Sequence, residues 1–445
     1  MYMVFNNISE MNFLFSCVVL AFCWSLCVAT DKLISVFAVI RHGARTMIYN
    51  EFSDITSDAS LKSLGRLTNV GKRQEYLLGC YFSKRYSKLI KSITHHNQIY
   101  IRSSGLERTI ESAQAFSLGL LQNTKCKSLS GKQSKAALPP INVQGLDDLT
   151  RKLGNEPYPH CQMSPPTHSG YAVIDYAFSP HMFCNSFAED EKLLTQALEE
   201  LDMKYATLYE KINEILPEHM RPKDWNADLC YRLDDNMYVV ETSGTKLLLE
   251  MDDETRSLVK ICSFESTYHG YMRSQLKNKL VAHVVLEELT KSFKMKDERK
   301  LTVLSLSDVH ILSLLKIFQW RDIAHIPYAS SLIFEVYNTT NSKGKSSLRV
   351  EALYNDKRLE LRNGLSDYKK FIRFVESSKL KDYDDFMKNC RVDPIEELIK
   401  ESHTDSTFKE LITVLAISFA LIFTYFIYKC SKKKHYIHFK AKQGE

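Results

Sequence analysis

Short apolar runs alternate with longer helix-prone segments along much of the chain. Leu33–Ile40 (LISVFAVI) has the apolar, β-branched composition of a buried strand, and Ile99–Ile101 and Leu301–Leu306 are two further strand candidates. The first two are followed by segments with helical spacing of apolar positions, Leu67–Tyr86 and Glu107–Leu121. Strands that alternate with helices predict an α/β fold, which we expect to be a doubly wound, mainly parallel sheet.

The middle of the chain has a different pattern. Residues 152–293 are charged and helix-prone, above all over Glu189–Ile215 and Tyr268–Lys291, and they carry few strand signals. We therefore expect a mostly helical second domain, inserted between two α/β parts at about residues 31–151 and 294–398.

A hairpin is predicted near the end of the second α/β part. Ser331–Tyr337 and Leu348–Tyr354 have strand patterns and flank the polar run NTTNSKGKSS. The triplet Asn338-Thr339-Thr340 in that run is an N-glycosylation sequon. The pattern predicts an exposed hairpin loop with glycosylation at Asn338.

Two long apolar runs stand at the ends of the chain. Asn12–Ala29 is apolar and ends in a small residue, which predicts a signal peptide over residues 1–30, with a retained N-terminal anchor as the alternative. Leu411–Tyr428 carries no charged residue and is long enough to cross a bilayer, which predicts a transmembrane helix at residues 409–428.

Composition and charge agree with one globular region between these runs. The chain is 44% hydrophobic and 25% charged, which excludes a wholly disordered chain and a polytopic membrane protein. Its net charge of +6 comes mostly from the lysines of residues 429–445, so the remainder is nearly neutral and no nucleic-acid partner is expected. The basic cluster predicts a cytoplasmic tail, hence a single-pass type I protein whose residues 31–408 are luminal or extracellular.

The tail also carries a candidate sorting signal. Tyr436 is followed three positions later by the bulky apolar Phe439. That spacing suits recognition by an endosomal clathrin adaptor, although four-residue matches also arise by chance. Cys430, at the inner end of the span, is a candidate for palmitoylation.

The cysteines between signal and span predict disulfide bonds. They are Cys80, Cys126, Cys161, Cys184, Cys230, Cys262 and Cys390. In an oxidising compartment most of them should pair, and because the number is odd at least one stays without an intramolecular partner. None has the CxxC spacing typical of zinc sites, so no metal is expected.

Charged residues follow each of the three predicted strands. Arg41-His42-Gly43-Ala44-Arg45 follows the first, Arg102 and Arg108 belong to the segment after the second, and Ser307-Asp308-Val309-His310 follows the third. In an open α/β sheet the ligand site lies beyond the carboxyl ends of the strands, so we expect these side chains to meet in one crevice.

The residue types in that crevice suit phosphate chemistry. Guanidinium groups clamp tetrahedral oxyanions through paired hydrogen bonds, a histidine can attack phosphorus, and a carboxyl can protonate the leaving oxygen. Taken singly, each residue has a simpler interpretation, since Asp308 could be a helix N-cap and Arg108 could pair with Glu111. Together they point to hydrolysis of phosphate monoesters.

Five segments carry a resemblance to a known family. They are RHGAR, GRLTNVGKRQ (Gly65–Gln74), YIRSSGLERTIESAQA (Tyr100–Ala115), SLSDVHILSLL (Ser305–Leu315) and PYASSLIFEVY (Pro327–Tyr337). In this order, over roughly Leu33–Leu398, they resemble the successive motifs of the histidine acid phosphatases, and the terminal segments resemble the membrane-anchored lysosomal branch. The resemblance implies a two-domain fold without metal or other cofactor, often in a homodimer.

The resemblance also implies a role for individual residues. His42 matches the nucleophile that becomes phosphohistidine. Arg41, Arg45 and Arg108 match the clamp that binds the phosphate, and Asp308 matches the proton donor to the leaving group.

At one important position the sequence departs from the family pattern. The family has a histidine before the aspartate that helps to hold the phosphate, and here that residue is Ser307. Loss of one transition-state donor costs about a hundred- to a thousandfold in rate. Ser307 could replace part of this with a neutral hydrogen bond, and His310 could turn into the gap. The leading hypothesis is an acid phosphatase, and the alternative is a catalytically impaired pseudophosphatase that binds phosphorylated ligands.

A second departure concerns a cysteine. The family's cysteine after PYAS is Ser331 here, so its usual partner, which the resemblance assigns to Cys230, must be free or re-paired. Cys262 is one candidate for that pairing. The physiological substrate and the final compartment, lysosome, endosome or cell surface, stay open at this point.

Overall fold

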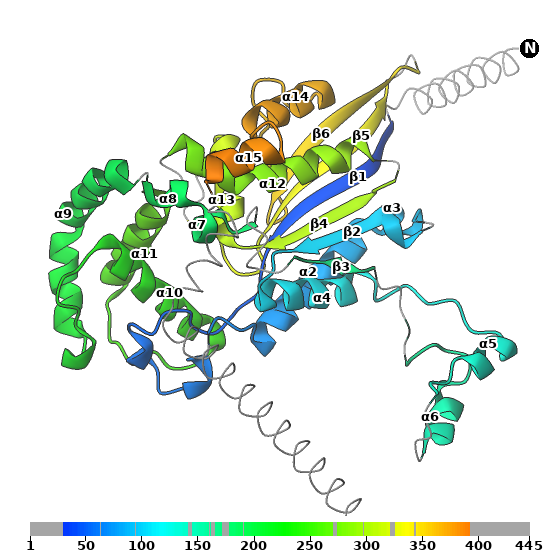
Figure 1. The fold of residues 1–445 in the computed structure, drawn as a ribbon, viewed down its shortest axis with the longest axis horizontal. Coiled ribbons are helices and arrows are strands. Elements are labelled where there is room, and N and C mark those ends of the chain that lie inside the picture. The colour runs from blue at the N-terminus through cyan, green and yellow to red at the C-terminus, as the bar shows by residue number, and fades with distance from the viewer. Residues whose placement is uncertain are drawn as a thin grey trace, which may run out of the picture. The chain divides into compact units, whose positions relative to one another are not determined.

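A seven-stranded mixed sheet forms the centre of the fold (Figure 1). Its strands, in the order β3-β2-β4-β1-β5-β6-β7 across the sheet, are β1 Thr30–Arg41, β2 Ile99–Ser103, β3 Thr167–His168, β4 Leu301–Leu306, β5 Ser331–Thr340, β6 Ser346–Tyr354 and β7 Lys357–Leu359. This computed structural model describes residues 30–391, apart from 63, 94, 141–144, 160, 162–164, 171–177, 190, 270–273, 297, 321–324 and 342–343.

The sheet has a parallel and an antiparallel part. Strand β1 pairs in parallel with β4, β4 with β2, and β2 with β3. On its other side β1 pairs with the antiparallel β5, which continues into β6 and β7. The predicted α/β class is therefore confirmed, with the parallel pairings among β3, β2, β4 and β1. The predicted hairpin corresponds to β5 and β6.

Helices follow the strands in the sequence. They are α2 Asn69–Arg85, α3 Ser87–Lys91, α4 Glu107–Leu120, α5 Gly131–Ala136, α6 Leu146–Leu153, α7 Pro180–Phe183, α8 Asn185–Glu189, α9 Glu191–Ile215, α10 Ala227–Ser243, α11 Asp253–Thr267, α12 Gln275–Lys294, α13 Asp308–Ile317, α14 Tyr368–Ser378 and α15 Tyr383–Cys390. Helix α2 begins where the Thr68 hydroxyl accepts a hydrogen bond from the Gly71 N–H, and α12 begins where Ser274 caps Lys277 in the same way. The sequence pattern marks α2 and α4 to within two residues at each end, whereas α12 starts seven residues later than predicted.

Both faces of the sheet are covered by helices. Val36, Ala38 and Ile40 of β1 belong to a hydrophobic cluster with side chains of α2, α3 and α4. Because side chains alternate along a strand, Phe37 and Val39 point to the opposite face, where α12 and α13 pack against β1. All five side chains are fully buried, which explains the continuous apolar run. The doubly wound arrangement is therefore confirmed.

A second hydrophobic cluster lies among the helices of the insertion. Helices α9, α10 and α11 bury their apolar faces against one another and against Met47, Phe52 and Ile55 from the segment after β1. The mostly helical insertion is thus confirmed. Helix α12 comes from the same stretch of sequence but packs against β1 and β4, and the boundaries predicted at residues 152 and 293 stay a prediction.

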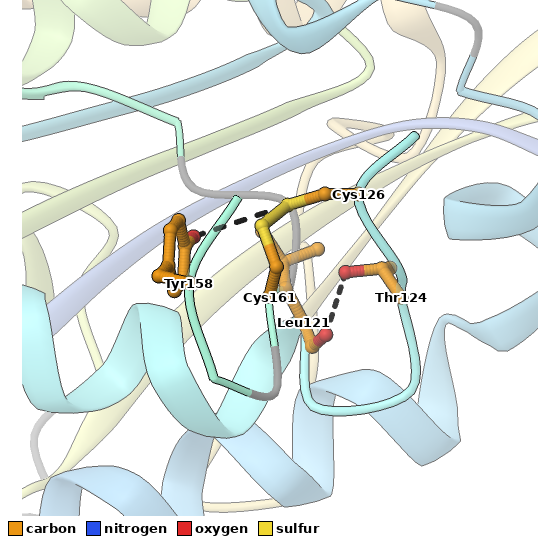
Figure 2. The surroundings of a disulfide bond; sticks show 5 residues. All are labelled: Leu121, Thr124, Cys126, Tyr158 and Cys161. Carbon is orange, nitrogen blue, oxygen red and sulfur yellow. Dashed lines mark hydrogen bonds between the residues drawn. A yellow bond between two sulfur atoms is a disulfide. The ribbon is translucent and has the colours of Figure 1, made fainter. Parts of the chain in front are cut away.

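Two disulfide bonds join cysteines of the described region. Cys126 pairs with Cys161, and Figure 2 shows that the Tyr158 hydroxyl lies beside this bridge, 3.9 Å from Cys126 Sγ. Cys184 pairs with Cys390. Disulfides of this kind are typical of proteins of the secretory pathway.

Cys80, Cys230 and Cys262 form no disulfide. The buried thiols of Cys230 and Cys262 lie within hydrogen-bonding distance of each other, next to Val259 and Tyr209. The sequence suggested Cys262 as a new partner for Cys230, and the structure brings the two side chains together without a disulfide bond.

The predicted hairpin loop is shorter than the sequence suggested. Asn338-Thr339-Thr340 forms the end of β5, and the connection to β6 covers only residues 341–345. The register pairs Asn338 with Lys32 of β1 and Leu348 of β6, so strand pairing extends into the polar run. Glycosylation at Asn338 stays a prediction.

The membrane-related predictions lie outside the described residues. These are the signal peptide at residues 1–30, of which only Thr30 is described, the span at 409–428, and Cys430, Tyr436 and Phe439 of the tail. Within residues 30–391, where described, no helix combines the length and apolar character that a membrane crossing requires.

Candidate active site

The predicted site residues lie at the carboxyl ends of adjacent parallel strands. Arg41 is the last residue of β1, with His42 and Arg45 in the loop after it. Arg108 lies in the first turn of α4, which follows β2, and Asp308 is the first residue of α13, which follows β4. Because β2, β4 and β1 are neighbours and parallel, the topology brings all five to the same edge of the sheet (Figure 1).

The loop after β1 is fixed by backbone hydrogen bonds. The His42 N–H donates to the Leu306 carbonyl at 3.0 Å, and the His42 carbonyl accepts from the Ala329 N–H at 3.2 Å. The Gly43 N–H donates to the Ser112 hydroxyl of α4 at 3.1 Å. These bonds connect His42 and Gly43 to the last residue of β4, to α4 and to the segment before β5.

Two glycines allow the loop to lie against α2. A Cβ atom on Gly43 would lie 2.4 Å from the Gly71 carbonyl oxygen, and one on Gly71 would lie 2.2 Å from the Ala44 carbonyl oxygen. Any side chain at either position would push backbone against backbone. The glycine in the RHG motif is therefore required by packing, and the same contact explains the glycine of GRLTNVGKRQ.

The His42 side chain is buried and held in one tautomer. Its Nδ1 lies 2.8 Å from the Gly43 carbonyl oxygen. A carbonyl can only accept, so Nδ1 carries the proton and Nε2 keeps its lone pair in the neutral ring. Burial and the positive charges of Arg108, Arg41 and Arg45 lower the pKa of His42 well below its ordinary value. The ring is therefore neutral even in mildly acidic solution, and its Nε2 carries no proton.

Each of the three arginines keeps a buried N–H without a partner. Arg41 binds Asp308 with 2.7 Å between Nη2 and Oδ2, and Arg45 binds Asp235 with 2.8 Å between Nη2 and Oδ1. In all three of Arg41, Arg45 and Arg108 the Nε atom is buried and makes no hydrogen bond within the described structure. Unsatisfied buried donors are costly, and an oxyanion among them would remove that cost.

Arg108 differs from the other two because no carboxylate of the described residues forms an ion pair with it. The sequence offered Glu111 as a possible partner of Arg108, but the Glu111 carboxylate forms an ion pair with Lys72 at 3.0 Å instead. Burial and the charge of Arg45 lower the pKa of Arg108 to about 10, at which it is still fully charged in neutral or acidic solution. Arg108 therefore provides a cation that is available to a ligand.

Asp308 is ionised in this arrangement. Burial alone would raise the pKa of Asp308, but Arg41, Arg45, the Val309 N–H and Arg108 together hold it below its ordinary value. The Val309 N–H donates to Asp308 Oδ1 at 2.9 Å. The side chain is 34% exposed, so a leaving group can reach it.

The sequence suggested that Ser307 or His310 could take the place of the missing histidine. Ser307 is the N-cap residue of α13, but its side chain makes no capping hydrogen bond. His310 is buried, and its Nε2 donates to the Phe178 carbonyl at 3.1 Å, so it does not turn into the space beside Ser307. Burial and the neighbouring His181 lower the pKa of His310 to about 4.

Sequence reasoning missed the residues that complete the site from other elements. Asp235 comes from α10, where nothing in the local sequence marks it as a partner of Arg45. The ring of Tyr328 lies 4.5 Å from the Arg41 guanidinium carbon and 5.7 Å from the His42 ring. Tyr328 belongs to the PYAS motif, so the sequence marked this segment but gave no role to its tyrosine.

A cavity of about 150 Å³ opens next to Arg41 and Asp308. Aromatic side chains of α10 and α11, Tyr231, Tyr238 and Phe264, form part of its wall. Its position against the carboxyl of Asp308 suits the group that leaves from a bound phosphate ester. Among the described residues, no group of three or more His, Cys, Asp or Glu side chains is arranged to hold a metal ion.

Comparisons with a family profile and with curated proteins indicate the same family. The sequence profile described as "Histidine phosphatase superfamily (branch 2)" matches residues 49–355. Rat (Rattus norvegicus) prostatic acid phosphatase is 26% identical over 311 residues, 68% of this chain and 74% of that protein. Rat lysosomal acid phosphatase is 23% identical over 310 residues, 69% of this chain and 67% of that protein.

Solved structures share the fold. The apo form of the Hafnia alvei phytase has a TM-score of 0.56 at 14% identity, and the alignment covers 82% of this chain and 99% of the phytase. The phytase of Klebsiella sp. ASR1 also has a TM-score of 0.56 at 14% identity, covering 80% and 98%. At this identity the likeness concerns the fold alone.

Proposed function

The chain belongs to the histidine phosphatase superfamily (branch 2), and on that premise we propose that it is an acid phosphatase that hydrolyses phosphate monoesters through a phosphohistidine at His42. The profile match begins after residues 41–45, so the proposal for His42 depends on the geometry of the site. The observation that carries it is the group of three arginines whose Nε donors are unused beside a buried, neutral imidazole.

The first step of the proposed reaction transfers the phosphoryl group to the protein. Arg41, Arg45 and Arg108 hold the phosphate oxygens, and His42 Nε2 attacks phosphorus on the side opposite the leaving oxygen. As the P–O bond to the alcohol breaks, a proton from the Asp308 carboxyl goes to that oxygen. The alcohol leaves, and Asp308 remains as a carboxylate.

The second step restores the protein. A water molecule gives a proton to the Asp308 carboxylate and attacks phosphorus, and the P–N bond to His42 breaks. Inorganic phosphate leaves, His42 is again a neutral imidazole, and Asp308 releases the proton to solvent once the phosphate no longer offsets the charge of the arginines. The same carboxyl acts as acid in the first step and as base in the second.

A pseudophosphatase is the second candidate function, because Ser307 stands where the family has a phosphate-holding histidine. Two measurements on the purified protein distinguish an acid phosphatase from a pseudophosphatase. The acid phosphatase should hydrolyse 4-nitrophenyl phosphate between pH 4 and 6 and bind inorganic phosphate in calorimetry. Phosphate binding without any turnover would support the pseudophosphatase, and the absence of both would contradict the proposed site.

Phosphate binding is expected to bring a proton onto Asp308. In the free protein the pKa of Asp308 lies below its ordinary value, so the carboxyl is ionised at pH 5. A bound dianion offsets the charge of the arginines and raises that pKa, so part of the carboxyl takes up a proton. Calorimetry at pH 5 in buffers of different ionisation enthalpy should give more proton uptake per phosphate for the wild type than for Asp308→Asn. Equal uptake would exclude Asp308 as the group that is protonated.

The cavity predicts which alcohols are accepted. Its cations are Arg41, which is paired with Asp308, and Lys260, whereas Asp234 and Asp235 add negative charge to the same wall. Asp235 is paired with Arg45, Asp234 with Arg256, and Lys260 lies 4.0 Å from Glu241, so further phosphate groups on the substrate would find no unpaired cation on this wall. Despite the fold shared with phytases, kcat/KM for 4-nitrophenyl phosphate should exceed that for inositol hexakisphosphate on the order of 100-fold. Equal values, or a preference for the polyphosphate, would contradict this charge argument.

The membrane topology that the sequence predicts is the last part of the proposal. A signal at residues 1–30 and a span at 409–428 would hold the phosphatase region on the luminal or extracellular side, and the two disulfides support that location. Tyr436 and Phe439 would then face a cytosolic clathrin adaptor and direct the protein towards lysosomes or endosomes. The family often forms homodimers, which we propose here on that basis alone.

A further inference from the structure

The backbone of Tyr328 is held in place beside the nucleophile. The N–H of the next residue, Ala329, donates to the His42 carbonyl at 3.2 Å. The N–H of Tyr328 itself donates to the hydroxyl of Tyr238, on α10, at 3.2 Å. The segment before β5 is therefore joined both to the loop after β1 and to α10, and these two connections bring Tyr328 to the candidate active site.

The ring of Tyr328 is packed among side chains of the site. The guanidinium carbon of Arg41 lies over it, 4.5 Å from the ring centroid, and the His42 ring lies 5.7 Å away between centroids. The ring of Tyr238 stacks on it at 4.7 Å, with an angle of 23° between the two planes. Only 6% of Tyr328 is exposed. Close packing of this kind fixes the ring, and with it the place of the hydroxyl.

The hydroxyl of Tyr328 is buried and makes no hydrogen bond within the described structure. Buried tyrosine hydroxyls usually have a partner, because an unsatisfied polar group in the interior costs free energy. Burial raises the pKa of Tyr328 to about 12, although the charges of Arg45 and Arg41 act in the opposite direction. The hydroxyl therefore keeps its proton in acidic and neutral solution and is an unused hydrogen-bond donor.

This unused donor belongs to the same group as the unused donors of the clamp. The Nε atoms of Arg41, Arg45 and Arg108 are likewise buried without a hydrogen bond in the described structure. A negative charge on the Tyr328 oxygen would raise the pKa of all three arginines, which agrees with a position near each of them. An oxyanion accepts several hydrogen bonds from charged and neutral donors, so one bound phosphate can satisfy all four groups.

We propose that the hydroxyl of Tyr328 donates a hydrogen bond to the phosphoryl group that the three arginines hold. The inference rests on the proposed function, because it assigns a further ligand of the same phosphate. A phosphoryl group on His42 would lie next to this phenol, since the two rings are 5.7 Å apart. Tyr328 thereby gives the site a neutral donor beyond the arginines, in a chain that has Ser307 in place of the family's phosphate-holding histidine.

Tyr328→Phe tests the proposal, because it removes the hydroxyl and keeps the ring. The affinity for inorganic phosphate, measured by calorimetry at pH 5, should fall by about 10- to 100-fold, as expected for a hydrogen bond to a charged group. The melting temperature of the phosphate-free variant should equal or exceed that of the wild type, since the lost hydroxyl has no partner there. Tyr368→Phe is the matched control. Its hydroxyl donates to the Phe293 carbonyl at 2.8 Å, so its loss should lower the melting temperature and leave phosphate affinity unchanged.

A second variant separates a phosphate contact from a structural role. With 3-fluorotyrosine in place of Tyr328, the O–H is a stronger donor, so phosphate should bind more tightly than to the wild type. An unchanged phosphate affinity in either variant would overturn the proposal, and so would a lower melting temperature of phosphate-free Tyr328→Phe, which would give the hydroxyl a structural partner. Phosphate binding is measured without turnover. A wild type that binds phosphate but is inactive would therefore contradict only the proposed acid phosphatase, whereas one that binds no phosphate would contradict both.

Discussion

The His42→Ala protein should lose at least about a thousandfold in kcat while it still binds inorganic phosphate. The neighbouring arginines stay protonated, and His310 donates its Nε2–H to the Phe178 carbonyl, so neither can replace the lost imidazole as nucleophile. The phosphate clamp itself is unchanged by the substitution. Initial rates with 4-nitrophenyl phosphate at pH 5 and calorimetry with phosphate measure the two quantities on the same preparation.

The control for this variant is His219→Ala, which removes a 63% exposed imidazole that lies beside Asp54 and has no part in the clamp, and which should keep wild-type kcat. A melting curve shows whether the small void left by the buried ring has unfolded the protein. If folded His42→Ala retained more than about a tenth of the wild-type kcat, a covalent step at His42 would be excluded.

Asp308→Asn should produce the second-largest loss, and its size should depend on the alcohol that leaves. The amide keeps the shape of the side chain, including an oxygen that can accept from the Val309 N–H, but cannot give a proton to the leaving oxygen. For an alkyl phosphate, which needs that proton, kcat should fall by about 10²- to 10⁴-fold. For 4-nitrophenyl phosphate, whose phenolate leaves more easily, the fall should be clearly smaller.

The same substitution should not weaken phosphate binding. It removes the carboxylate that is paired with Arg41 at 2.7 Å, so the guanidinium becomes more available to the anion. Phosphate affinity measured by calorimetry should therefore be equal to or tighter than that of the wild type. An equal loss of kcat for both kinds of ester would contradict the role of Asp308 as proton donor.

The sequence predicted the part of the site that follows from topology. Arg41, His42 and Asp308 lie directly after apolar strand runs, and the pattern of those runs was sufficient to place them on one sheet edge. Arg45 lies in the loop after β1, and Arg108 lies in the first turn of the helix after β2. The rule that ligand sites lie beyond the carboxyl ends of parallel strands therefore predicted both positions.

The remainder of the site depends on packing that no local pattern records. Asp235 reaches Arg45 because α10 packs against the segment after β1, where Asn236 also donates to the Tyr49 and Glu51 carbonyls. Asp235 has no strand, motif or regular spacing next to it in the chain. The polar end of β5 was misjudged for a related reason, since pairing with both β1 and β6 extended the strand through Asn338.

Direct detection of the phosphorylated residue tests the central claim. Wild-type protein is mixed with a ³²P-labelled phosphate monoester at pH 5, quenched within milliseconds in alkali, and digested for peptide mapping. The account predicts an acid-labile, alkali-stable label on the peptide that contains His42, and no label in His42→Ala. A wild-type protein that turns over substrate but carries no label on His42 at any quench time, or carries it on another residue, would contradict the account.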